Sequence, residues 1–295
     1  MNKRLLSLLM LTGAMVIFGT VGLFRRLIPL ASAPIALLRG AVGLTILLLL
    51  MLLSRKKISF PAIRKNLLWL ILSGACLGIN WILLFEAYNY TSVAVATVCY
   101  YTAPVLVMLV SPLLLKERIT LRRGICIFVA LIGTVFVSGI LKPAGTEGDL
   151  RGVLFGLGAA AFYGAVMILN QKIRDISAYD KTITQLAAST VVLLPYVLFT
   201  GWGATGPVTP TAIVMLLILG VVHTGIAYAL FFGSMTHLPA QTVALFSYAD
   251  PAVAILVSAF VLTEPIGVWE ILGIIFVLGA TIVSEFPERK PEKHA

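Results

Sequence analysis

Successive apolar runs of about 20 residues constrain this chain more than any other feature. The run over residues 35–53 is an example, because apolar side chains reach every face of a helix drawn through it. An α-helix rises about 1.5 Å per residue, so about 20 residues cross the roughly 30 Å of hydrocarbon in a bilayer. Strands of a membrane barrel would be about ten residues long and would alternate apolar with polar side chains. The pattern therefore predicts an all-α membrane protein.

Composition agrees with this interpretation. Hydrophobic residues make up 60% of the chain and charged residues 12%, and the mean hydropathy is +1.03. A soluble globule of 295 residues would need more polar surface than this. We expect ten spans, joined by connections too short for a folded soluble domain, at residues 5–24, 34–53, 67–87, 94–115, 122–140, 152–170, 182–200, 211–230, 240–262 and 268–285.

The basic residues are distributed unevenly along this pattern. Seventeen of the 22 Lys and Arg residues fall at the two ends of the chain and in the even-numbered connections. The odd-numbered connections hold four, Arg25, Arg26, Lys142 and Arg151, and Arg39 lies within a span. Cytoplasmic loops carry the excess of Lys and Arg in membrane proteins. We therefore expect both termini in the cytoplasm, and the net charge of +10 requires no nucleic-acid partner.

The sequence also repeats itself at an offset of 147 residues. The offset brings Tyr101, Pro104 and Glu117 onto Tyr248, Pro251 and Glu264. Each half, 1–143 and 144–295, then holds five spans, and an odd number inverts the second half relative to the first. Inverted repeats that meet in mid-membrane are a recurrent architecture for alternating access. The repeat favours a transporter over a duplicated scaffold with a merely structural role.

With these features the chain resembles the EamA-like branch of the drug/metabolite transporter superfamily. The features that carry the resemblance, in order, are the aromatic-Gly pairs Phe18-Gly19 and Tyr163-Gly164, the stretch 85–92 leading into Tyr101-x-x-Pro104, the span ends Glu117 and Glu264, and the Gly-rich fifth and tenth spans. The resemblance implies a central cavity lined by spans 1, 3, 4, 6, 8 and 9. It also implies secondary transport of amino acids, amines or other small metabolites, often outward. We expect a multi-pass exporter in a prokaryotic cytoplasmic membrane, without a cofactor.

Asp250 is the most informative single residue, because it lies about midway through the ninth span. An aspartate at the centre of a membrane helix costs about 2.5–3.5 kcal/mol, so it should face a partner or a wet cavity, or be protonated. We interpret it as a substrate-binding or proton-binding group. The alternative is a locally capped kink at Asp250-Pro251. His223, in the eighth span, could exchange a proton or bind substrate, or could be a packing histidine.

Aromatic residues gather where the family would place its cavity. The candidates for substrate binding are Trp81, Tyr100, Tyr101, Tyr163, Tyr228, Phe246 and Tyr248, with Asn80 as a weaker polar candidate. Aromatic rings suit apolar or cationic cargo, since a cation over a ring gains roughly 0.5–2 kcal/mol. The alternative is an interfacial aromatic belt or ordinary packing.

Other residues suggest structural or gating roles. Arg39 and Glu86 have opposite charges at similar predicted depth and could pair. We favour a snorkelling or bridging Arg39 and a Glu86 that marks the membrane boundary. Pro104, Pro251, Glu117 and Glu264 are interpreted as kinks and loop anchors. The small pairs Gly74/Gly78 and Gly152/Gly156 are interpreted as close helix contacts.

Two other classes of protein remain as alternatives, a membrane enzyme and a non-transporting scaffold or sensor. The chain has no HExxH, GxSxG, Walker or CxxC motif, so we expect neither an enzyme nor a metal site. Cys76, Cys99 and Cys126 all fall within apolar runs and are interpreted as core residues. Without a nucleotide-binding motif, transport would draw on a solute or proton gradient. The sequence does not indicate an oligomeric state.

Overall fold

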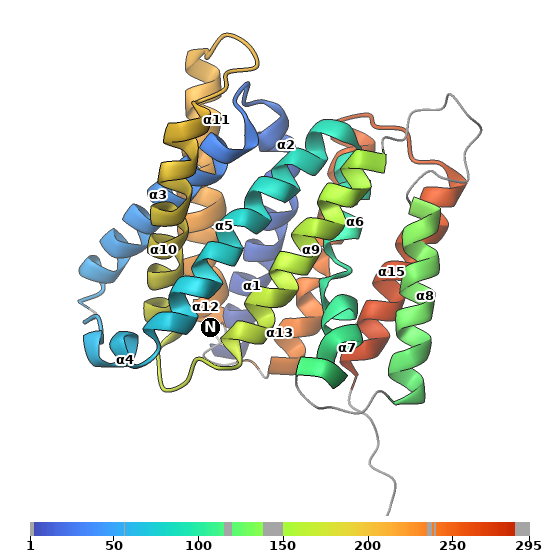
Figure 1. Cartoon of the computed structure of the whole chain (residues 1–295), viewed down its shortest axis with the longest axis horizontal. Helices are drawn as coiled ribbons and strands as arrows, with labels where there is room; N and C mark the ends of the chain where they lie inside the picture. The colour runs from blue at the N-terminus through green and yellow to red at the C-terminus, as the bar shows by residue number, and fades with distance from the viewer. Residues whose placement is uncertain are drawn as a thin grey trace, which may run out of the picture.

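The structure is a computed structural model that describes residues 3–55, 57–114, 120–137, 150–234, 238 and 240–286. Nearly all of the described chain is helical (Figure 1). The first half holds α1 (Lys3–Gly19), α2 (Val21–Arg26), α3 (Ser32–Leu53), α4 (Phe60–Lys65), α5 (Leu67–Tyr90), α6 (Val93–Tyr100), α7 (Ala103–Leu114) and α8 (Leu121–Val137). The second half holds α9 (Leu150–Asn170), α10 (Ala178–Thr200), α11 (Pro210–Gly220), the π-helix η1 (Val221–Ile226), α12 (Ala227–Ser234), α13 (Ala240–Ser247), α14 (Ala249–Leu256), the π-helix η2 (Val257–Val261) and α15 (Val268–Glu285).

Seven helical stretches of the described chain are long and apolar enough to cross a membrane. They are Lys3–Arg26, Ser32–Leu53, Leu67–Tyr90, Val93–Val110, Leu150–Asn170, Ala178–Thr200 and Pro210–Ser234. Three shorter apolar helices, Gly124–Phe136, Ala249–Val261 and Val268–Val283, fall within the remaining predicted spans. The helical membrane architecture is confirmed, whereas ten complete crossings stay a prediction.

Small residues let the helices approach one another closely, as predicted for the two glycine pairs. A Cβ on Gly74 would lie 2.5 Å from the Gln185 carbonyl of α10, and one on Gly156 would lie 2.8 Å from the Cys99 Cβ of α6. Gly78 and Gly152 are similarly enclosed. In membranes, where lipid is as apolar as Leu, such close packing is a main source of helix association. The prediction of close helix contacts at these pairs is confirmed.

The fourth and ninth predicted spans are both interrupted, at positions that match under the 147-residue offset. α6 ends at Tyr100 and α7 begins at Ala103, while α13 ends at Ser247 and α14 begins at Ala249. Pro104 and Pro251 each lie in the first turn after the break. A proline is tolerated there because the first-turn N–H groups lack helical partners in any case. Each interruption leaves irregular backbone within the bundle.

The first helix of each half packs against the interrupted helix of the other half. A Cβ on Gly19 of α1 would lie 2.6 Å from the Asp250 carbonyl oxygen, and one on Gly164 of α9 would lie 3.6 Å from the Ala103 carbonyl oxygen. Ala103 and Asp250 are equivalent under the 147-residue offset. The same kind of contact therefore occurs twice, once from each half to the other. The contact at Gly19 is the closer of the two.

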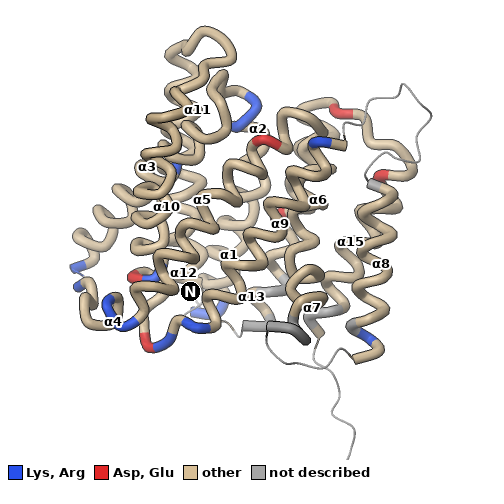
Figure 2. Tube along the Cα trace, in the orientation of Figure 1, with Lys and Arg blue, Asp and Glu red and all other residues tan. Residues whose placement is uncertain are grey.

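Charge is distributed unevenly between the two ends of the bundle. Figure 2 shows Lys and Arg gathered mainly at the end where the N-terminus lies, with Asp and Glu prominent at the opposite end. We refer to these as the N-terminal end and the far end. Between them the helices are almost free of charge in the described chain. The exceptions, Arg39 and Asp250, direct attention to the middle of the bundle.

Candidate functional site

Asp250 lies in the first turn of α14, immediately after the break at Tyr248. The helix macrodipole favours a negative charge at this position. Asp250 Oδ2 accepts a hydrogen bond from the Tyr101 hydroxyl at 2.6 Å, a length typical of a bond to a charged oxygen. Asp250 is half-buried, so its carboxyl group combines one protein partner with some accessible surface. Tyr101 lies at the equivalent break in the other half, so the bond joins the two interruptions.

Tyr101 belongs to a group of four half-buried tyrosines, Tyr100, Tyr101, Tyr163 and Tyr248, which we call the tyrosine group. Their ring centroids are separated by 5.1 Å for Tyr163 and Tyr100, 5.5 Å for Tyr100 and Tyr101, and 6.2 Å for Tyr101 and Tyr248. The group spans α9, the α6–α7 break and the α13–α14 break. Tyr101 links this group to Asp250, and the rings can receive an apolar or cationic group.

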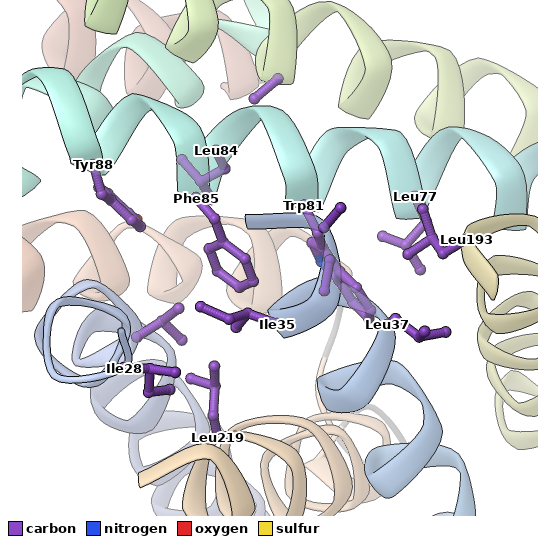
Figure 3. Packing of buried hydrophobic residues seen from close by; sticks show 14 of the residues in the cluster. Ile28, Ile35, Leu37, Leu77, Trp81, Leu84, Phe85, Tyr88, Leu193 and Leu219 are labelled. Carbon is purple, nitrogen blue, oxygen red and sulfur yellow. The ribbon is translucent and has the colours of Figure 1, made fainter. Parts of the chain in front are cut away.

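Arg39 lies on α3 and is 4% exposed. Its Nε donates to Thr224 Oγ1 at 2.9 Å, and its guanidinium carbon lies 4.6 Å from the centre of the Trp81 ring and 5.6 Å from that of Phe85. Figure 3 shows Trp81 and Phe85 extending from α5 into the buried cluster that contains Ile35. Arg39 is therefore buried and does not pair with Glu86, and its bond to Thr224 joins α3 to η1, which is compatible with the bridging alternative given above.

The surroundings of Arg39 depend on the rotation of α3 about its own axis. The sequence gives the depth of Arg39 but not the face it occupies on a helix that is apolar all round. That face is packed against α5 and η1, where aromatic rings and a threonine hydroxyl offer partners for a guanidinium. Arg39 forms no ion pair with any described residue.

His223 is buried on η1, one residue before Thr224. Its Nε2 lies 2.9 Å from Thr20 Oγ1, its Nδ1 lies 3.3 Å from the Ile218 carbonyl, and its ring centroid is 4.6 Å from that of Phe24. A neutral imidazole satisfies both contacts if Nδ1–H donates to the carbonyl and the Thr20 hydroxyl donates to Nε2. These contacts favour the packing role, which was one of the two readings of His223.

The remaining predicted aromatic and amide residues separate into two sets. Tyr228 is half-buried, and its ring lies 5.4 Å from Phe18 of α1. Asn80 instead turns toward α9, where its side-chain nitrogen donates to the Ala159 carbonyl at 2.6 Å. Phe246 is exposed and makes no ring contact with the tyrosine group. The structure therefore brings Tyr228 near the centre and leaves Asn80 and Phe246 outside it.

At the far end, Glu264 holds three segments together. Its Oε1 pairs with Arg26 Nη2 at 2.7 Å, and its Oε2 accepts from the backbone N–H of Val93, the first residue of α6, at 2.8 Å. The Ser258 hydroxyl also donates to Oε2. Arg26 donates in addition to the Thr91 carbonyl at 2.8 Å. We call this set of contacts the far-end clamp. The equivalent residue of the first half, Glu117, lies outside the described residues.

Glu86 belongs to a second far-end network. Its Oε2 accepts from the Ser32 hydroxyl at 2.6 Å and from the Asn89 side-chain nitrogen at 3.2 Å. Buried Arg25 donates to Asn89 Oδ1 at 2.9 Å. At the N-terminal end, Lys65 Nζ and Asp175 Oδ2 pair at 2.7 Å on the surface. The hydrogen bond from Lys65, with its charge, holds the pKa of the Asp175 carboxyl below its ordinary value.

Several residues around the centre and at the far end were not predicted from the sequence to have these contacts. Thr20 and Thr224 hold His223 and Arg39, and neither stands out within an apolar run. Arg25 and Arg26 were counted only as loop charges. The 147-residue offset was one signal for the far end, because it paired Glu264 with Glu117 at a repeated helix end. No comparable sequence signal marked Thr20 or Thr224.

These apolar helices, with a buried arginine and a half-buried aspartate among them, define a multi-pass α-helical membrane protein. The sequence profile described as the EamA-like transporter family matches residues 5–139 and 150–285. The chain belongs to this family and is a membrane transporter by homology.

Relatives agree with the family assignment, and a solved structure shares the fold. The chain is 29% identical to the uncharacterized transporter YxxF of Bacillus subtilis, over 90% of this chain and 84% of that one. It is 27% identical to the uncharacterized transporter YwfM of the same organism, over 100% and 99% of the two chains. A crystal structure at 18% identity has a TM-score of 0.61 and covers 94% of this chain and 96% of its own, which supports the fold.

Proposed function

We propose that this protein is a secondary transporter that moves small organic metabolites, amino acids or amines among them, out of the cell by alternating access. The observation that carries the proposal is the Asp250 carboxylate, hydrogen-bonded to Tyr101 at 2.6 Å and bordered by the tyrosine group at two equivalent helix breaks. Intramembrane carboxylates mark substrate and proton pathways far more often than they serve structure alone. Interrupted helices at mid-membrane are the usual setting for such sites.

The arrangement of the halves supports alternating access. Gly19 meets Asp250 and Gly164 meets Ala103, so each first helix packs on the interrupted helix of the other half. The contact at Gly19 is closer than the one at Gly164, and the far-end clamp ties α2, α6 and the segment before α15 together. We infer that the two halves exchange these arrangements as the site opens to one side and then the other. Export is the direction that the family resemblance implies.

Asp250 is the group we assign to substrate binding and proton coupling. It has one described hydrogen-bond donor and retains accessible surface, whereas both ring nitrogens of His223 already have partners. A proton or a cationic substrate would occupy the same carboxylate in turn, which is a direct way to couple two gradients. Of the two candidates for the proton carrier, Asp250 and His223, we therefore favour Asp250.

Transport of labelled amino acids and amines into everted membrane vesicles, with and without an imposed proton gradient, tests this function. We expect accumulation that depends on the gradient and is abolished in Asp250→Asn. Tyr196→Phe is the matched control, because Tyr196 is exposed on α10. Gradient-dependent uptake that survives Asp250→Asn would remove the assigned role. A complete absence of flux for every solute would favour the scaffold or enzyme alternatives.

A further inference from the structure

The 147-residue offset holds for the helices as well as for the sequence motifs. Adding 147 to the first residue of α1, α6 and α8 gives the first residue of α9, α13 and α15, and α3 and α10 begin within one residue of equivalent positions. The connection from α2 to α3 lies at the far end, whereas its equivalent, the connection from α9 to α10, lies at the N-terminal end (Figure 1). The same part of each half therefore serves opposite ends of the molecule.

At the far end, a charge network ties this connection to the neighbouring helix. Arg25 is 5% exposed and donates to Ser32 Oγ at 3.3 Å and to Asn89 Oδ1 at 2.9 Å. The Ser32 hydroxyl donates in turn to Glu86 Oε2 at 2.6 Å. A cation at the end of α2 is thus joined through two polar side chains to a carboxylate on α5. Together with the far-end clamp, this network holds α2, α3, α5 and α6 together at the far end.

At the N-terminal end, the carboxylate of Asp180 lacks an equivalent partner. Asp180 is the third residue of α10 and is 3% exposed. Its Oδ2 accepts from the Ser177 hydroxyl at 2.9 Å, but its Oδ1 is enclosed without a hydrogen-bond partner in the described chain. A buried charged acceptor that lacks a partner is destabilising. Such a group is retained where another conformation supplies the partner.

Lys172 is the cation that the symmetry places near Asp180. It is equivalent to Arg25 under the offset, and Ser32 is equivalent to Tyr179, which directly precedes Asp180. Because Arg25 reaches Ser32 across its own connection, the equivalent path leads from Lys172 to the start of α10. In this conformation the Lys172 side chain is exposed and makes no hydrogen bond or ion pair with a described residue.

The other charges at this end do not offer the same pairing. Lys65 is engaged with Asp175 at 2.7 Å on the surface. The equivalent of Glu86 is Gly233, which has no side chain, so the second half lacks a carboxylate at that position. Asp180 supplies a carboxylate from α10 instead.

We propose that Lys172 and Asp180 form a latch that closes the N-terminal end when the far end opens. The conformation described here is then the one closed at the far end, with the Arg25–Glu86 network formed and the Lys172–Asp180 latch open. The proposal rests on the alternating access proposed above and names the contacts that hold each end shut. Asp180 acts on the equilibrium between the two conformations and does not touch the solute.

A cysteine at position 93 reports how often the far end opens. Val93 is fully buried, and a Cβ on Gly22 of α2 would overlap its side chain, so α2 covers it. Val93→Cys keeps the backbone N–H that Glu264 accepts. The reporter is introduced after the three native cysteines have been replaced. The measurement is the rate at which a water-soluble maleimide labels the purified full-length protein in detergent.

Lys172→Gln is the decisive variant, because Lys172 has no described side-chain contact to lose in the present conformation. We expect it to slow labelling about two- to fivefold, the range that partly exposed ion pairs supply. Lys172→Arg should keep the wild-type rate, since it retains the charge. Arg174→Gln, exposed in the same connection, is the matched control and should leave the rate unchanged.

Two further variants act on the carboxylates. Asp180→Asn should slow labelling as Lys172→Gln does, because both remove the latch. Glu86→Gln should have the opposite effect and speed labelling, because it weakens the network that closes the far end. If Asp180→Asn does not fold, Lys172→Gln carries the test.

Two results would overturn the proposal in distinguishable ways. If Lys172→Gln labels at the rate of Arg174→Gln while Glu86→Gln still speeds labelling, Asp180 is only a helix cap and alternating access stands. If Glu86→Gln also leaves the rate unchanged, the two ends do not open in turn, and the proposed alternating access fails together with the latch.

Discussion

Tyr101 and Asp250 come from opposite halves of the chain and meet through one hydrogen bond of 2.6 Å. At the residue scale, this bond fixes the direction of a carboxylate that would otherwise rotate. We expect Tyr101→Phe to weaken the binding of an ammonium-bearing ligand by about tenfold to a hundredfold, because a hydrogen bond to a charged group contributes about 1.5–3 kcal/mol. Titration calorimetry in detergent measures the change. Equal affinities for Tyr101→Phe and the control Tyr196→Phe would contradict the assignment.

Gly19 supports the same site through close packing. A Cβ there would lie 2.6 Å from both the Asp250 carbonyl oxygen and the Val253 Cβ, so backbone would have to move. We expect Gly19→Ala to lower the free energy of unfolding by roughly 1–3 kcal/mol, as overpacked cores do. Gly13→Ala, on the same helix, is the matched control, since its nearest neighbour is Leu230 Cδ1 at 4.0 Å. Thermal unfolding in detergent should show a loss for Gly19→Ala alone. Similar melting temperatures would contradict the packing argument.

The residue scale also shows where sequence reasoning stops. Asp250 could be singled out because a charge inside an apolar run is costly wherever it points. Arg39 was equally visible, but its role depends on the rotation of α3 and on the neighbours Trp81 and Thr224, which the sequence does not encode locally. Asn80 shows that neighbours in sequence need not share a face. It adjoins Trp81 in sequence but turns toward α9, because neighbouring helical residues point about 100° apart.

Among the elements, the long apolar helices were predictable and their interruptions only partly so. Long apolar runs set the helices, and Pro104 and Pro251 indicated breaks near Tyr101 and Tyr248. The break at Thr20 and the π-helix η1 had no such signal. η1 places His223 and Thr224 opposite the Ile218 and Leu219 carbonyls five residues earlier, and Arg39 and Thr20 complete those contacts from other helices. Such segments depend on tertiary partners.

The far-end clamp gives a prediction for the elements it joins. The side chains of Arg26 and Glu264 are 35% and 14% exposed, whereas those of Lys65 and Asp175 are 66% and 75% exposed. We expect a double-mutant cycle of Arg26→Met and Glu264→Gln to give a coupling free energy of roughly 1 kcal/mol, the upper end for surface pairs.

The second ion pair is the control for this cycle. Lys65→Met and Asp175→Asn should show a smaller coupling, because water screens this more exposed pair. Thermal melts of each variant in detergent supply both cycles. A far-end coupling no larger than the control would mean that Glu264 acts through its bond to the Val93 N–H alone and not through Arg26.

For the whole molecule, charge predicts orientation. Lys and Arg gather at the N-terminal end (Figure 2), which should therefore face the cytoplasm. We expect Thr205→Cys, in the connection after α10, to react with a membrane-impermeant thiol reagent in intact cells. Arg55→Cys, after α3, should react only in permeabilised cells. The measurement is made after Cys76, Cys99 and Cys126 have been replaced. The opposite pattern of labelling would invert the proposed topology and, with it, the assigned direction of transport.

The central claim is that solute crosses the membrane through the site formed by Asp250 and the tyrosine group. Exchange of labelled amino acids in proteoliposomes that contain the purified protein tests it most directly. We predict flux above that of empty liposomes for the wild type and for Tyr196→Phe, with little or no flux for Asp250→Asn. Flux that is equal in all three proteins would contradict the account, because the solute would then follow a path that Asp250 does not line.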